Sequence, residues 1–184
     1  MKRMYLLLLW LLPFIMLPIY SQAISQSELS DSSRYVQFKS VADYKVYYVD
    51  MESITPITAP EGHKRITATV YALVDGEDYI AAVKMEYDYQ LARSLRQLLS
   101  KHDVLKYQGQ DSPYISVWRD KQDNIGITCR ILGVKGYTLS GNSIAELYKI
   151  DNVYKDISEL SFKGNQYKML NAIYKQAYSI YFDD

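Results

Sequence analysis

Cysteine is nearly absent from this chain, which has a single one among 184 residues, Cys129. One thiol cannot form a disulfide within the chain, so the sequence excludes the small exported proteins that depend on internal disulfides. The thiol could act as a nucleophile or an intermolecular bridge, or the residue could be a small buried hydrophobic side chain. Its neighbours Ile127, Ile131 and Leu132 favour the last interpretation, a buried residue on a strand.

The chain also lacks an excess of either charge, with 21 Lys and Arg against 21 Asp and Glu. This balance provides no general attraction to nucleic acid, which we exclude as an expected partner. Histidine is scarce too, with only His63 and His102. No spacing of His, Cys or carboxylates resembles a zinc or calcium site, and we therefore predict no metal and no cofactor.

Catalytic groups are equally sparse. No serine lies in a Gly-x-Ser-x-Gly turn. Two carboxylate pairs at alternate positions, Asp50 with Glu52 and Glu86 with Asp88, could act as acid and base on one strand face. Such alternation is more typical of a solvated sheet face. We therefore predict no catalytic residues and a protein that is not an enzyme.

The first 23 residues are the clearest signal that the sequence does contain. Lys2 and Arg3 precede an apolar run over residues 6–17, and small residues lead up to Ala23. This three-part pattern predicts a secretory signal cleaved after Ala23, and hence an exported protein that is periplasmic or secreted to the cell surface. The alternative is an uncleaved anchor, but Pro13 and Pro18 interrupt the apolar stretch within and just after residues 6–17, and we expect no integral membrane protein. Residues 24–33 are polar and predict a flexible lead-in.

Tyrosine is abundant, with 19 residues, and it suits half-buried strands. Strand-like runs start near Arg34 and at residues 45–50. The strongest local signal is Asp75-Gly76 between residues 65–74 and 79–87, which predicts a hairpin. In its second arm apolar residues alternate with Lys84, Glu86 and Asp88, which predicts one packed face and one solvated face.

Residues 90–103 are ambiguous. Their leucines recur with helical spacing, at positions 91, 95, 98 and 99, and this pattern alone indicates an amphipathic helix. Three short strand-like runs follow, at residues 114–118, 125–132 and 137–139.

Residues 143–184 predict two helices. Ser143 and Glu146 match a capping box, and helical spacing of apolar residues continues to Val153. A second helix is expected from Asn165, with an apolar stripe that includes Leu170 and Ile173.

A basic patch stands out in the middle of the chain, formed by Arg93, Arg96, Lys101, His102 and Lys106. The simpler interpretation is the solvated side of a surface element. The functional interpretation is a docking stripe for an acidic protein or a sulfated polysaccharide, since arginines give bidentate contacts.

Three segments together resemble the surface-adhesin protein E family of Gram-negative bacteria. Residues 47–54 (YYVDMESI) are similar to its YYID-x-x-SI opening, and residues 93–97 (RSLRQ) are similar to its central strand. Residues 143–147 (SIAEL) resemble the start of its last helix. The likeness covers residues 34–154, but Asp103 and a residue near Val153 stand where the family usually has cysteines.

The resemblance implies an α+β fold, with a mostly antiparallel β-sheet and C-terminal helices packed on it. The chain would then hold a single domain over residues 34–184, in which residues 155–184 are an extra helical extension. The family pattern also implies that residues 91–99 form a strand, and we adopt that assignment over the helical periodicity.

The resemblance also implies a protein-binding site at Arg93, Ser94, Arg96, Gln97 and Lys101, with host matrix or serum proteins as partners. Our first hypothesis is an exported, non-enzymatic binding protein that presents this basic strand face to a host or envelope protein. The alternative is a periplasmic accessory or small-ligand-binding protein without an extracellular partner, with tyrosines lining a crevice between sheet and helix. A Tyr-rich edge strand also allows a homodimer.

Overall fold

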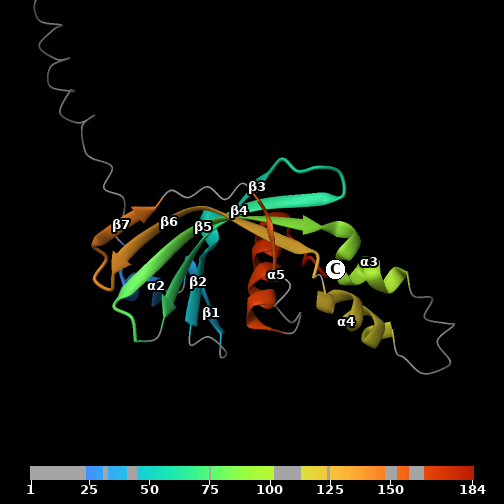
Figure 1. Cartoon of the computed structure of the whole chain (residues 1–184), viewed down its shortest axis with the longest axis horizontal. Coiled ribbons are helices and arrows are strands. Elements are labelled where there is room, and N and C mark those ends of the chain that lie inside the picture. Colours follow the sequence, from blue (N-terminus) through green and yellow to red (C-terminus); the bar gives the residue numbers. More distant parts are fainter. Residues whose placement is uncertain are drawn as a thin grey trace, which may run out of the picture.

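The computed structural model describes residues 24–30, 33–40, 45–74, 76–101, 113–123, 125–147, 153–157 and 164–184. These residues form an α+β fold around one antiparallel sheet, as predicted (Figure 1). The predicted secretory signal, residues 1–23, lies outside the described residues. No helix in the described ranges has the length and apolar character needed to cross a membrane.

The sheet runs in the order β1-β2-β4-β5-β6-β7, with β3 added beside β4 and β8 beside β6. Its centre consists of three strands of 12 residues each, and shorter strands lie on both sides. The strand bounds are β1 (Tyr35–Ser40), β2 (Lys45–Asp50), β3 (Thr55–Ile57), β4 (His63–Val74), β5 (Tyr79–Gln90), β6 (Ile127–Thr138), β7 (Ser143–Leu147) and β8 (Lys155–Asp156).

The hairpin predicted around Asp75-Gly76 is confirmed. β4 and β5 pair from His63 opposite Gln90 to Leu73 opposite Ile80, and Gly76 in the connection has a φ of +83° that favours glycine. This hairpin places the middle of the chain at the centre of the sheet.

Two apolar clusters cover opposite faces of the sheet. Successive strand residues point to opposite faces, and the neighbours Tyr48 and Val49 accordingly belong to different clusters. The larger cluster lies under α5 (Asn165–Tyr178), whose apolar stripe confirms the helix predicted from Asn165. The smaller cluster lies under α2 (Gln26–Ser30), whose Leu29 is buried. Residues 26–30 are therefore helical and packed, where the sequence suggested a flexible lead-in.

The strand adopted for residues 91–99 is wrong. These residues form the 3-10 helix η2 (Leu91–Arg93) and the α-helix α3 (Leu95–Ser100), as the leucine spacing alone indicated. The reason lies at the end of β5, where the pairing with β4 ends at Gln90 and that with β6 at Tyr89. Beyond those positions no strand among the described residues pairs with the segment, and local helical hydrogen bonds satisfy its backbone instead.

The helix predicted from Ser143 is also wrong, because residues 143–147 form β7. A tight turn leads directly from β6 into this strand, with Thr138 N donating to the Asn142 carbonyl and Gly141 at a φ of +94°. Cross-strand pairing with β6 therefore overrides the capping box. Residues 148–152 of the expected helix lie outside the described residues, and α5 is the one C-terminal helix among those described.

Residues 114–118 are helical rather than extended, within α4 (Pro113–Asp123). Pro113 opens this helix, a position that proline favours. The two later strand-like runs, 125–132 and 137–139, fall largely on the single strand β6. Helices α3 and α4 lie together at the end of the sheet opposite to α2 (Figure 1).

Candidate functional site

The binding residues predicted from the resemblance lie on helical turns, so they do not form a strand face. Arg93 packs closely on Gly126, because a Cβ added to Gly126 would lie 2.4 Å from the Cβ of Arg93. The guanidinium of Arg93 donates to the Asp120 carbonyl. Ser94 is buried and caps α3 by accepting a hydrogen bond from Gln97 N. Two of the five residues therefore stabilise the fold.

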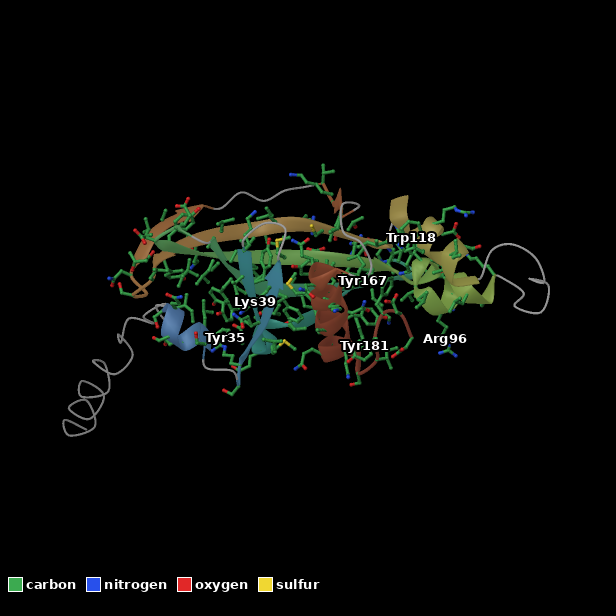
Figure 2. The ribbon with its side chains drawn as sticks, turned by 90° about the horizontal axis from the view of Figure 1, so that it is seen from below. Tyr35, Lys39, Arg96, Trp118, Tyr167 and Tyr181 are labelled. Atoms are coloured by element: carbon green, nitrogen blue, oxygen red, sulfur yellow. The ribbon has the colours of Figure 1, made fainter. Side chains whose placement is uncertain are left out.

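The remaining predicted residues, Arg96, Gln97 and Lys101, are exposed. Arg96 points outward at the α3 end of the molecule, and its Nη1 lies 3.2 Å from the Asp184 carbonyl oxygen (Figure 2). His102 and Lys106 of the basic patch lie outside the described residues. A basic surface is present on α3, but the predicted strand geometry is not.

A pocket lies between the sheet and the first turns of α5. Its volume is about 210 Å³. Four strands form its floor, the start of α5 forms its roof, and Ile157, just after β8, forms a side wall. The lining side chains are Tyr47, Val70, Ala72, Val83, Met85, Tyr87, Cys129, Ile157, Gln166, Met169 and Leu170.

The pocket forms where short side chains of the floor meet the beginning of the helix. Asn165 is the first residue of α5, and its amide donates to the Lys39 carbonyl, which fixes the helix start over β1. Farther along α5, large side chains such as Tyr174 fill the space against the sheet. Below the first turns, Ala72 and Val83 are too short to do so, and a void remains.

Among the described residues, the pocket lining carries no Lys, Arg, His, Asp or Glu side chain. Its polar groups are the side-chain amide of Gln166, the hydroxyls of Tyr47 and Tyr87, and the thiol of Cys129. The Gln166 amide nitrogen lies 3.4 Å from the Tyr47 hydroxyl. Such a site suits a neutral, largely apolar molecule, because burying an unpaired charge there would be costly.

The most informative of these groups is Tyr87, whose side chain is 3% exposed. Its hydroxyl has no hydrogen-bond partner among the described residues, whereas its buried neighbour Tyr89 donates to the Leu170 carbonyl at 2.9 Å. Burial raises the pKa of Tyr87, with further contributions from Cys129 and Tyr47, so it remains a neutral donor. Buried hydroxyls normally have partners, and this one is available to a ligand in the pocket.

On the opposite face of the same strands, Glu86 and Asp88 are buried, which overturns the predicted solvated face. Arg130 Nη2 lies 2.7 Å from Glu86 Oε2. Asp88 accepts from Arg65 Nε at 3.2 Å, and His63 Nδ1 lies 3.0 Å from its other oxygen. Arginines from the two flanking strands therefore neutralise both carboxylates, as Arg34 does for the buried Asp50.

Tyr154 completes this polar cluster. Its hydroxyl donates to Glu86 Oε1, and the guanidiniums of Arg65 and Arg130 each lie 5.0 Å from the centre of its ring. Burial and the bond to Glu86 raise the pKa of Tyr154 to about 12. Burial disfavours the charged form of Glu86, but the bonds from Tyr154 and Arg130 outweigh this effect and lower its pKa.

Another polar network joins α4 to the C-terminal turn. Lys121 is 1% exposed, and its Nζ donates to the Tyr167 hydroxyl at 2.6 Å and to Asp183 Oδ1 at 3.1 Å. Asp183 also accepts from Tyr167 and Asn171. Burial lowers the pKa of Lys121 although Asp183 favours its charged form. The network connects α4, α5 and the C-terminal turn, a structural role.

No family model, curated protein or solved structure matches this chain. The resemblance to the surface-adhesin protein E family therefore stays a prediction. Within the described residues, no group of three or more His, Cys, Asp or Glu side chains could hold a metal ion.

Sequence patterns placed some of the lining residues on packed strand faces, but they did not identify a pocket. Cys129 lies on a strand and is half-buried, and the alternation of residues 79–87 correctly placed Val83, Met85 and Tyr87 on the packed face. The patterns missed Gln166 and Ile157. Gln166 lies on the helix predicted from residue 165. Its position next to the apolar stripe of that helix was the one sequence feature that could have indicated contact with the pocket. Residue 157 had no comparable signal.

Proposed function

We propose that this chain is an exported protein that binds a small neutral molecule with an apolar body and one hydrogen-bond acceptor. The site is the pocket between α5 and the sheet. The observation that carries this proposal is the Tyr87 hydroxyl, a buried donor without a partner among the described residues, in a pocket whose described lining carries no charged side chain. Of our two hypotheses, this is the small-ligand-binding alternative.

The volume of the pocket supports a ligand of about one aromatic ring with a short substituent. An apolar cavity of about 150 Å³ accommodates benzene, and the volume here is about 210 Å³. The lining is mainly aliphatic and aromatic side chains, with two methionines, Met85 and Met169, that can adapt to different shapes. A few polar groups in an apolar crevice are typical of small-molecule sites.

The acceptor requirement can be tested with a matched pair of ligands. Acetophenone carries a carbonyl oxygen, whereas α-methylstyrene has the same shape with a CH2 group in its place. We expect Tyr87→Phe to weaken acetophenone binding about fivefold, the effect of one neutral hydrogen bond, and to leave α-methylstyrene binding unchanged. Isothermal titration calorimetry on the folded chain measures both.

Two controls sharpen this test. Tyr174→Phe removes another buried hydroxyl, from a residue outside the pocket lining, and should change neither affinity. Benzoate, which is similar in size but anionic, should bind much more weakly than acetophenone. Equal loss of both neutral ligands in Tyr87→Phe, or no binding of either to the wild-type chain, would contradict the proposal.

A further inference from the structure

Residues 153–157 connect the pocket to the polar cluster on the other face of the sheet. The short strand β8 within them pairs with β6 through Thr128 opposite Asp156 and Cys129 opposite Lys155. Side chains along a strand alternate between faces. Tyr154 therefore joins Glu86 on one face, while Ile157 lines the pocket on the other.

The backbone pairing of this segment is short, with only two register pairs. Tyr154 adds a side-chain attachment to this pairing, because it donates to the buried Glu86 and its ring lies against two guanidiniums. Its neighbour Val153 is 69% exposed and contributes little burial. A hydrogen bond to a charged group is stronger than each neutral backbone hydrogen bond of such a short ladder, so losing it should loosen the segment.

The segment also covers one side of the pocket. Ile157 forms the wall there, and the residue paired with Lys155 is Cys129, whose thiol lines the floor. When residues 153–157 leave the edge of β6, the wall is lost and Cys129 becomes accessible from that side.

We propose that residues 153–157 are a strap that controls entry to the pocket, held closed by the clamp of Tyr154 on Glu86, Arg65 and Arg130. Breaking the clamp on one face of the sheet opens the ligand site on the other. Tyr154 is thus a positioning residue that need not touch the ligand, and Ile157 is the wall that it holds in place. This inference rests on the proposed function only for the identity of the ligand that enters the pocket.

Cys129 is the only cysteine of the chain, so the strap can be tested without any ligand. The rate at which methyl methanethiosulfonate modifies Cys129 in the folded full chain reports how often the pocket opens. Tyr154→Phe removes the bond to Glu86 but keeps the ring, and we expect this rate to rise about tenfold. Tyr154→Ala removes both contacts and should raise it further.

Tyr181 provides a matched control, since it too contacts a charged side chain. Its hydroxyl accepts from Lys175 Nζ at 2.9 Å, and it lies on the turn after α5 (Figure 2). Tyr181→Phe and Tyr181→Ala should leave the modification rate unchanged. A rate in Tyr154→Phe and Tyr154→Ala equal to that of the wild type overturns the strap, as does an equal rise in the Tyr181 variants.

The outcome is separable from that of the ligand experiment. A raised thiol reactivity without acetophenone binding supports the strap and contradicts the proposed function. Acetophenone binding that depends on Tyr87, together with unchanged thiol reactivity in the Tyr154 variants, supports the proposed function and overturns the strap.

Discussion

At the scale of single residues, Glu86 shows how a buried carboxylate stays ionised. It is 3% exposed, yet Arg130 and Tyr154 both donate to it, and its pKa lies below the ordinary value of 4.5. The folded state therefore keeps this carboxylate charged at pH values where the unfolded chain binds a proton. The stabilisation is present above about pH 4.5 and is lost as the pH falls through the pKa of the folded state.

We expect Glu86→Gln to flatten the acid dependence of stability. The variant should lose about 2 kcal/mol at neutral pH, because it weakens hydrogen bonds to charged groups in a buried position. Its free energy of unfolding should then fall less than that of the wild type between about pH 5 and pH 3. Urea titrations at several pH values measure both effects.

Glu52→Gln is the matched control, because the Glu52 side chain is 71% exposed and lies 3.5 Å from Arg34. It should change stability by less than about 0.5 kcal/mol. An acid dependence of Glu86→Gln identical to that of the wild type would show that the ion pair contributes nothing to folding.

The residue pattern predicted which side chains share a face, but not what covers each face. Alternation placed Glu86 and Asp88 opposite to Tyr87, as observed. It could not show that Arg65 and Arg130, which are remote in sequence, lie on the flanking strands at matching positions. That depends on the register of three strands, which local sequence does not encode.

At the scale of elements, α3 is held by its N-terminal cap. Ser94 Oγ accepts from Gln97 N at 3.2 Å, and Leu98 is buried beneath the helix. We expect Ser94→Ala to lower the free energy of unfolding by about 1 kcal/mol, the usual cost of losing a cap. Chemical denaturation followed by circular dichroism measures this loss.

Ser100→Ala is the comparison, since Ser100 is exposed near the other end of the same helix and, among the described residues, donates to the Gln97 carbonyl of its own helix. We expect a change within about 0.5 kcal/mol. If both variants behave alike, the cap does not stabilise α3 as we describe.

Elements determined by local signals were predicted, and elements determined by distant partners were not. The hairpin of β4 and β5 has its turn signal in the sequence, and α5 has its apolar stripe. Residues 143–147 carry a helix signal, but β6 pairs with them directly after a tight turn. Residues 91–100 form helical turns because no described strand pairs with the chain beyond Gln90, whereas the family resemblance implied a strand there.

At the scale of the whole molecule, the pocket joins segments that are far apart in the chain. Tyr47, Tyr87 and Gln166 come from three regions, and they meet only when the sheet is assembled and α5 packs across it. The family resemblance implied the α+β class, and our alternative hypothesis supposed a tyrosine-lined crevice between sheet and helix, but the sequence indicated neither the full lining nor the size of this pocket. An extracellular protein partner and a homodimer stay predictions.

The most direct test of the central proposal is an NMR titration of the folded chain, with its methionine methyl groups labelled with ¹³C, against acetophenone. Met85 and Met169 line the pocket. Met51 packs against the same apolar core but is not among the described residues that line the pocket. We predict saturable shifts of the Met85 and Met169 signals and a constant Met51 signal. No shift of Met85 and Met169 at saturating acetophenone, or equal shifts of all three, would contradict a ligand site between α5 and the sheet.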